Sequence, residues 1–378
     1  MKVALFTDGI YPYVIGGMQK HSWYLAKFLA AAGVSVDLYH IRVKNDKTDS
    51  AAVFADGERK MINEILIEFP SMGSGFGHYI RESYEYSKSV FAEFSKREKP
   101  DLIYAKGFSG WETISRKTKG EALPPVLVNF HGYEMFQPAP SFRSMLQQRL
   151  LLRSPATFCI AHADKVVSYG GKITTLLQRI GVEEKRIIDI PSGIDEDWLQ
   201  ERKKGTEGKI KFLFIGRWER RKGVHELNKS LSQLQSDRFD FDFIGAIPQK
   251  NRMKRSGFNY LGEIRDVKKI KEVISSADVL VCPSLSEGMP NVILEAMAGG
   301  LAIIATDTGA VSELVNDANG WLIQPGNIVQ LTNALKNATQ LPMEELYAKQ
   351  IASRQRVMDE FLWKKIAART IDALKELV

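Results

Sequence analysis

The chain has 378 residues, of which 44% are hydrophobic and 26% charged, and it carries a net charge of +7. This length exceeds that of an ordinary domain and indicates two. The composition is that of a soluble globular protein, and every apolar run falls short of the ~20 residues that span a bilayer.

Two cysteines, Cys159 and Cys282, lie far apart in the sequence. They exclude a disulfide framework and indicate a reducing compartment. Met1 leads directly into a strand-like segment and not into a signal peptide, so we expect a cytoplasmic protein. A basic surface could attract phosphates, nucleic acid or an anionic membrane. Because no base-stacking motif accompanies the modest charge, we expect no nucleic-acid partner.

The first half of the chain alternates short apolar runs with helical patterns. The expected strands are Val3–Thr7, Val34–His40, Ile65–Phe69, Asp101–Ala105, Val126–Phe130, Lys165–Tyr169 and Ile187–Ile190. Helical spacing of apolar residues occurs at Met18–Ala32, Ser87–Lys99 and Phe142–Ala161. This alternation predicts a doubly wound α/β domain over residues 1–190, with a parallel sheet covered on both faces.

A loop containing Gly16 and Gly17 joins the first strand to the first helix. Glycines at this edge of a parallel sheet let the backbone approach a ligand closely. The loop lacks the G-x-G-x-x-G spacing, which disfavours a dinucleotide-dependent dehydrogenase. A second glycine cluster, Gly73–Gly77, also misses that spacing, and we expect it to form a flexible loop.

His131 directly follows the strand Val126–Phe130, so it should lie at the ligand edge of the sheet. Its imidazole could position an acceptor or bind a sugar hydroxyl, or it could be a structural loop histidine. His21, on the first helix, is interpreted as a packing or capping residue.

The segment Ser141–Arg153 is amphipathic and places Arg143, Arg149 and Arg153 among large apolar residues. Such a helix could lie on an anionic membrane surface. It could equally be a core helix with a solvated basic face.

A domain boundary is expected after Ile190. Pro191–Asp195 breaks the preceding pattern, and Gln200–Lys209 is polar and charged, as linkers are. A second alternating series then predicts strands at Lys211–Ile215, Phe239–Ile244, Tyr260–Leu261, Ala277–Val281, Leu301–Ala305 and Trp321–Ile323. We therefore expect a second domain over residues 191–360, and a final helix, about 361–378, that reaches back to the first domain.

Two strand-to-helix junctions of the second domain carry charged residues. Arg217 and Lys222 follow one strand and could neutralise a diphosphate, although basic residues are common on solvated turns. Glu287 precedes, and Glu295 lies within, a helix that is expected to begin near Pro290. A helix N-terminus favours phosphate, and two flanking carboxylates can accept hydrogen bonds from hydroxyls. The pattern suits a nucleotide-sugar, or else an ordinary buried strand-helix unit with a solvated glutamate.

The run Glu287-Gly-Met-Pro-Asn-Val-Ile-Leu-Glu295 resembles the E-x7-E signature of the retaining glycosyltransferase family 4. The glycine loop, the Arg217 and Lys222 pair and Pro191–Asp195 resemble further motifs of that family in the same order. The resemblance implies the GT-B fold, in which two Rossmann-like doubly wound parallel-sheet domains face each other across a deep cleft. The first domain would bind the acceptor and the second the donor.

The resemblance also implies roles for individual residues. Arg217 and Lys222 would hold the diphosphate, Glu295 the ribose and Glu287 the transferred sugar, with His131 lining the reaction centre. The implied catalytic residues are His131, Glu287, Arg217 and Lys222. The implied donor-binding set is Gly16, Gly17, Arg217, Lys222, Gly262, Ile264, Glu287, Gly288, Met289, Pro290, Asn291, Val292 and Glu295. The acceptor would meet Gln19, Lys20 and Tyr133.

The implied activity is that of a retaining hexosyltransferase that needs neither a metal nor a cofactor. It would move a sugar from a UDP- or GDP-sugar to a glycan or lipid-linked saccharide in cell-surface polysaccharide or glycolipid synthesis. The protein would be cytoplasmic and could contact the inner face of the cytoplasmic membrane. Two other hypotheses are a sugar-nucleotide epimerase or phosphorylase on the same fold, and a non-catalytic nucleotide-binding subunit of a glycan assembly complex.

Overall fold

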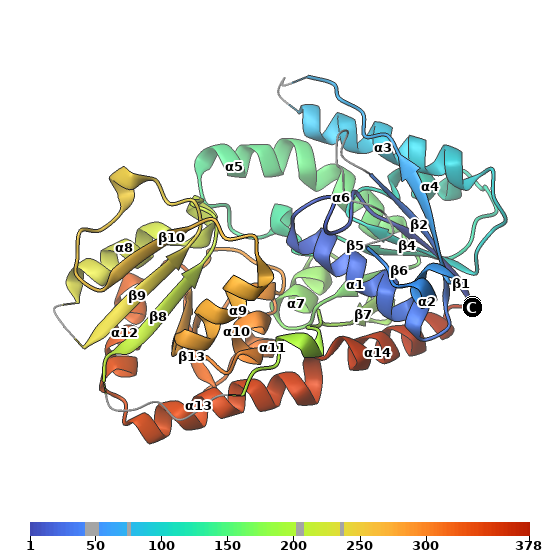
Figure 1. Ribbon diagram of the computed structural model, residues 1–378. Helices are drawn as coiled ribbons and strands as arrows, with labels where there is room; N and C mark the ends of the chain where they lie inside the picture. The colour runs from blue at the N-terminus through green and yellow to red at the C-terminus, as the bar shows by residue number, and fades with distance from the viewer. Residues whose placement is uncertain (42–52, 74–76, 202–207, 235–237) are drawn as a thin grey trace. The chain divides into compact units, whose positions relative to one another are not determined.

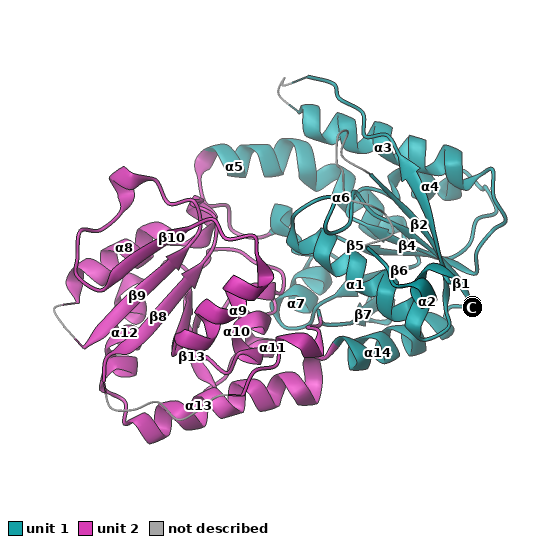
Figure 2. Cartoon of the chain, viewed as in Figure 1, with its two compact units in different colours: residues 1–136, 143–192, 363–378 teal, residues 137–142, 193–362 magenta. Residues whose placement is uncertain are grey.

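The computed structural model describes residues 1–41, 53–73, 77–201, 208–234 and 238–378. The chain forms two compact units, which Figure 2 distinguishes by colour. Unit 1 comprises residues 1–136, 143–192 and 363–378, and unit 2 comprises residues 137–142 and 193–362. Parts of the predicted linker Gln200–Lys209 and of the predicted loop Gly73–Gly77 lie outside the described residues.

In the described part of unit 1, seven parallel strands form one sheet in the order β3-β2-β1-β4-β5-β6-β7. The strands are β1 (Lys2–Phe6), β2 (Ser35–Ile41), β3 (Ile62–Ile67), β4 (Leu102–Lys106), β5 (Val126–Asn129), β6 (Lys165–Ser168) and β7 (Ile187–Asp189). The central strands β1, β4 and β5 are buried almost throughout, as a parallel sheet covered on both faces requires.

In the described part of unit 2, six parallel strands form a second sheet in the order β10-β9-β8-β11-β12-β13. They are β8 (Ile210–Ile215), β9 (Phe239–Ile244), β10 (Phe258–Gly262), β11 (Val279–Cys282), β12 (Ala302–Thr306) and β13 (Gly320–Ile323). The predicted fold class, two Rossmann-like parallel-sheet domains, is therefore confirmed.

Figure 1 shows the helices packed around each sheet. In unit 1 they are α1 (Gly17–Ala31), α2 (Asp56–Arg59), α3 (His78–Phe94), α4 (Trp111–Thr118), α5 (Phe142–Gln147, whose first residue belongs to unit 2), α6 (Arg153–His162), α7 (Lys172–Arg179) and α14 (Trp363–Lys375). In unit 2 they are α8 (Val224–Gln233), α9 (Val267–Ser276), α10 (Asn291–Ala298), α11 (Val311–Leu314), α12 (Ile328–Gln340) and α13 (Met343–Arg356). None of the described helices is both long and apolar enough to cross a bilayer.

Aromatic side chains fill much of both cores. In unit 1, Trp363 of α14 stacks on Tyr24 of α1, with ring centroids 5.5 Å apart. The C-terminal helix α14 therefore packs into the core of unit 1. In unit 2, the ring of Phe243 on β9 lies 4.3 Å from that of Phe241 on the same strand. It also lies 4.6 Å from the ring of Tyr260, which packs β9 against the edge strand β10.

Two predicted helices differ from the observed ones. α3 begins at His78 and not at Ser87, because polar residues in its first turns mask the apolar period. The predicted helix Phe142–Ala161 is divided into α5, a π-helical turn at Gln148–Leu152, and α6. A π-turn inserts one residue into the helical repeat, and periodicity alone does not reveal such an insertion.

Candidate active site

The two most informative loops of unit 2 follow neighbouring strands. The chain runs from β8 outward through β9 to β10, then returns to place β11 on the other side of β8. Ligands of doubly wound sheets bind at such a switch point, beside the carboxyl ends of the strands. The loop after β8 carries Arg217 and Lys222, and the loop after β11 carries Glu287.

Glu287 forms a compact ion-pair cluster with two cations from the neighbouring loop. Lys222 Nζ lies 2.6 Å from Glu287 Oε1, and Arg221 Nη1 lies 3.3 Å from Oε2. Arg221 Nη1 also donates to the carbonyl of Ser286 at 3.1 Å. Glu287 is only 6% exposed, whereas both cations reach the surface in part. The arrangement places a buried carboxylate behind two cations at the switch point.

Electrostatics keep this carboxylate ionised. Burial alone would raise the pKa of Glu287, but the charges of Lys222 and Arg221 and hydrogen bonds from Lys222 and Ser284 outweigh it. The net result is a pKa below the usual value of a glutamate. Glu287 is thus suited to accept hydrogen bonds and not to supply a proton.

Two glycines allow the loops to approach this closely. Gly223 has φ +67°, and a Cβ atom there would lie 1.8 Å from the carbonyl oxygen of Pro283. Gly309 has φ +59°, and a Cβ atom there would lie 2.2 Å from the carbonyl oxygen of Glu287. The backbone amide of Ala310 donates to Gly288 at 2.7 Å. Side chains at either glycine would push the loops apart.

The remaining donor-binding candidates of unit 2 lie on the same loop and helix or at nearby strand ends. Gly288, Met289 and Pro290 are buried, whereas Asn291 and Val292 in the first turn of α10 are partly exposed. Glu295 lies one turn further along α10 and is 9% exposed. Gly262 ends the edge strand β10 with φ +73°, and Ile264 follows it, half-buried.

Arg217 does not join the cluster. Its side chain is 77% exposed and pairs with Glu219 at 3.1 Å. Arg221, which the sequence prediction left out, takes the place beside Glu287. The signal that could have found it is the run Arg220-Arg221-Lys222, whose first member is held by Glu226 in a two-bond pair.

Gln137 is another residue that the prediction missed. Although it follows the His131 loop, it belongs to unit 2. Its Nε2 donates to the carbonyl of Glu287 at 2.6 Å, and its Oε1 accepts from Thr308 at 3.2 Å. Gln137 therefore buttresses the backbone of the Glu287 loop.

In unit 1 the corresponding switch point lies between β1 and β4. Gly16 caps α1 and Gly17 is its first residue, so the predicted glycine loop forms a helix N-terminus at that edge. Gln19 donates to Asp8 at 2.9 Å, and Lys20 is partly exposed on the same turn. Burial raises the pKa of Asp8 to about 6, against hydrogen bonds from Gln19 and its own backbone that lower it.

His131 follows β5 in a left-handed backbone conformation, with φ 58°. Its amide donates to Asn129 Oδ1 at 2.6 Å, and its Nδ1 lies 2.5 Å from the hydroxyl of Tyr169. Tyr133 is different, because it is fully buried and its hydroxyl donates to the carbonyl of Val167 at 2.6 Å. This burial leaves no surface for an acceptor, so we interpret Tyr133 as a structural residue.

A buried lysine also lies at this edge. Lys106, the last residue of β4, is 1% exposed, and its Nζ lies 3.0 Å from Nδ1 of His21. Burial holds the pKa of Lys106 well below its usual value. Burial, followed by the charges of Lys106 and His131, likewise lowers the pKa of His21. The pair is therefore a buried contact in which burial disfavours the protonated form of both side chains. Within the described residues, no group of three or more His, Cys, Asp or Glu is placed to hold a metal ion.

Two family models match this chain, one in each half. The family model described as Glycosyltransferase Family 4 matches residues 15–198, and that described as Glycosyl transferases group 1 matches residues 209–340. A putative teichuronic acid biosynthesis glycosyltransferase of Bacillus subtilis is 32% identical over 140 residues, which are 37% of this chain and 35% of that protein. The alignments with the first curated relatives span about half of those proteins or less.

Solved structures match the whole chain. Sucrose-phosphate synthase from Thermosynechococcus elongatus superposes with a TM-score of 0.78 at 20% identity, covering 100% of this chain and 98% of that one. An Anabaena protein solved with UDP and glucose superposes with a TM-score of 0.67 at 17% identity, covering 100% of both chains. At these identities the likeness bears on the fold alone. With one family model matching in each half and the GT-B fold throughout, the chain belongs to glycosyltransferase family 4.

Proposed function

We propose that the chain is a retaining glycosyltransferase that moves a sugar from a nucleotide-diphosphate sugar to a glycan or lipid-linked acceptor. The observation that carries this proposal is the Lys222, Arg221 and Glu287 cluster at the switch point of unit 2. A diphosphate needs cations, and a sugar needs hydrogen-bond acceptors. The cluster supplies two cations and one carboxylate in direct contact with each other.

The diphosphate would bind Lys222 and Arg221, with Arg217 as an additional cation from the same loop. These charges, together with the amides at the start of α10, would stabilise the negative charge that develops on the departing diphosphate. Protein cations would thus supply the stabilisation, and we propose that the transfer needs no metal or cofactor.

Glu287 would accept hydrogen bonds from hydroxyls of the transferred sugar, and Gly288–Val292 would line the sugar. Glu295 would bind the ribose, and Gly262 and Ile264 would lie against the base. From unit 1, Gly16 and Gly17 would meet the diphosphate, His131 would line the reaction centre, and Gln19 and Lys20 would meet the acceptor. Retention of configuration places the incoming hydroxyl on the face from which the diphosphate leaves.

The acceptor side could include a membrane contact through unit 1. Leu146 and Leu150 are 41% and 62% exposed, and Arg143 and Arg149 are exposed beside them. Arg153, in contrast, donates to the carbonyl of Met135 and is not part of this face. Exposed apolar and basic residues on one helical segment suit an anionic lipid surface.

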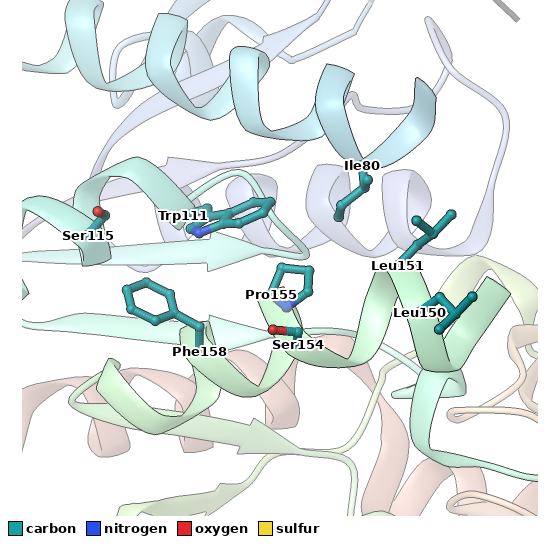
Figure 3. Close-up of a pocket in the computed structure, with 8 residues that line it drawn as sticks. All are labelled: Ile80, Trp111, Ser115, Leu150, Leu151, Ser154, Pro155 and Phe158. Atoms are coloured by element: carbon teal, nitrogen blue, oxygen red, sulfur yellow. The ribbon is translucent and has the colours of Figure 1, made fainter. Parts of the chain in front are cut away.

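An apolar pocket of about 480 Å³ adjoins this helical segment (Figure 3). Its lining residues are Ile80, Trp111, Ser115, Leu150, Leu151, Ser154, Pro155 and Phe158. The pocket supports an acceptor with a lipid portion. Flotation with vesicles of anionic and of neutral lipids tests this part. The wild type should float with the anionic vesicles, and replacing Arg143 and Arg149 with Gln should abolish this flotation. If the wild type floats with neither kind of vesicle, the membrane contact is refuted.

The transfer activity is tested with a panel of UDP-, GDP- and ADP-sugars, with and without saccharide acceptors. Turnover that requires a saccharide alcohol supports a glycosyltransferase, and turnover with inorganic phosphate supports a phosphorylase. Glu295→Ala should weaken binding of the nucleoside diphosphate itself, whereas Glu287→Ala should mainly lower sugar-dependent turnover. Equal loss of nucleoside diphosphate affinity in both variants would refute this division of roles.

A further inference from the structure

A hydrogen-bonded network in unit 1 holds the imidazole of His131. The Tyr169 hydroxyl oxygen lies 2.5 Å from His131 Nδ1, and the two rings meet edge-on with centroids 5.1 Å apart. Tyr169 follows β6, the strand next to the one that precedes His131, and is only 2% exposed. The contact therefore joins two neighbouring strand ends, with the tyrosine side buried and the histidine side half-buried.

Asn129 holds the backbone of His131 in the same network. Its Oδ1 accepts from the backbone amide of His131 at 2.6 Å, so its Nδ2 is the side that donates. Nδ2 donates to the hydroxyl of Tyr104 at 3.2 Å.

The hydrogen of the Tyr169 hydroxyl then has one destination. A phenol carries a single hydrogen, and buried hydroxyls donate it to a partner. Within the described residues, His131 Nδ1 is the acceptor that the structure provides for it. Burial holds the pKa of Tyr169 well above its usual value, so the hydroxyl keeps its hydrogen at neutral pH. Nδ1 must therefore bear a lone pair.

We propose that Tyr169 and Asn129 are positioning residues that fix His131 in the tautomer with its hydrogen on Nε2. In that tautomer Nε2 is a hydrogen-bond donor. His131 would bind an oxygen of the sugar or acceptor and would not take a proton from it. This role in transfer rests on the proposed function, whereas the tautomer does not.

The backbone reinforces the same orientation. His131 has φ 58°, a left-handed conformation that is unfavourable for most side chains. The bond from its amide to Asn129 and a 2.6 Å bond from the amide of Gly132 to the carbonyl of Phe130 hold this turn in place. A strained turn that is held on both sides of a histidine is typical of functional sites.

The tautomer can be measured without any substrate. Nitrogen-15 NMR of histidine-labelled protein at pH 8 distinguishes Nε2–H from Nδ1–H, and the His131→Asn spectrum identifies the signal of His131. We expect the Nε2–H form in the wild type and a mixed or inverted tautomer in Tyr169→Phe. Tyr104→Phe is the matched control, because this phenol bonds Asn129 but does not contact His131, and it should leave the signal unchanged.

An Nδ1–H or doubly protonated His131 in the wild type would overturn the proposal, even if Tyr169→Phe failed to fold. An unchanged signal in a folded Tyr169→Phe protein would overturn it as well. In the transfer assay, Tyr169→Phe should lower kcat about 5- to 100-fold, the effect of one lost hydrogen bond, with a smaller change in donor KM. Tyr104→Phe should retain wild-type kcat. If no sugar is transferred by the wild type, the proposed function fails while the tautomer result still stands.

Discussion

Replacing Lys222 with Met isolates the central electrostatic contact of unit 2. Two unit charges 2.6 Å apart attract by about 6 kcal/mol at an effective dielectric constant of 20. Breaking a buried pair from one side typically costs ~3–5 kcal/mol, because the other charge stays buried. Arg221 remains 3.3 Å from Glu287 and compensates in part. We therefore expect Lys222→Met to lower the free energy of unfolding by about 2–3 kcal/mol at pH 7.

The loss should depend on pH in a defined direction. The pKa of Glu287 is lowered in the folded wild type, so its contribution to stability is present above the unfolded pKa and is lost as pH falls through the folded value. In Lys222→Met, burial should dominate and raise that pKa. The difference in stability between the two proteins should therefore shrink as pH falls below the usual pKa of a glutamate.

Hydrogen exchange in urea, followed at amides of β11 and α10, reports the unfolding of unit 2 by itself. Arg217→Met is the matched control, since this exposed cation of the same loop pairs with Glu219 and should cost less than about 0.5 kcal/mol. Glu287→Gln should cost about 1 kcal/mol, because the two cations left behind can reach water. A Lys222→Met protein as stable as Arg217→Met would refute this reasoning.

Three further predictions concern single residues. Asp8→Asn keeps an oxygen that can accept the hydrogen bond from Gln19. It should raise the free energy of unfolding at pH 7 by about 2–3 kcal/mol, because the pKa of Asp8 rises to about 6 on folding. Thermal melts should show that this gain vanishes below pH 4. Lys106→Met should stabilise the protein at pH 7 and remove a rise in stability with pH of up to about 1.4 kcal/mol per pH unit, because burial lowers the pKa of the folded lysine below that of the unfolded one. An unchanged slope would contradict a lowered pKa of Lys106. Gly223→Ala should cost at least about 2 kcal/mol in urea unfolding, because its Cβ would meet the carbonyl of Pro283; wild-type stability would show that the loops can separate.

Much of the fold was predictable because the buried strands are continuous apolar runs. The strand Phe239–Ile244, for example, has the predicted bounds. The edge strand β10 was harder, since its side chains alternate in exposure and its register is irregular near Gly262. The π-turn at Gln148–Leu152 adds a residue that no local composition marks.

The site was predictable only as far as it is local in sequence. Glu287 and Glu295 lie just before and within the same predicted helix, and Lys222 ends the basic run Arg220-Arg221-Lys222. The cations that contact Glu287 depend on how the loop after β8 meets the loop after β11, about 65 residues further along the chain. In the structure Arg221, and not Arg217, lies beside Lys222 at Glu287. The contact of Tyr169 with His131 spans 38 residues and follows from the order of β5 and β6.

The most direct test of the donor site is hydrogen exchange of the whole chain with and without saturating UDP-, GDP- and ADP-sugars. We predict that at least one of them slows exchange of the amides of residues 219–224 and 287–295, on the two loops that meet at the β8–β11 switch point. Protection by none of these donors, or protection confined to other segments, would contradict a nucleotide-sugar site built on Lys222, Arg221 and Glu287.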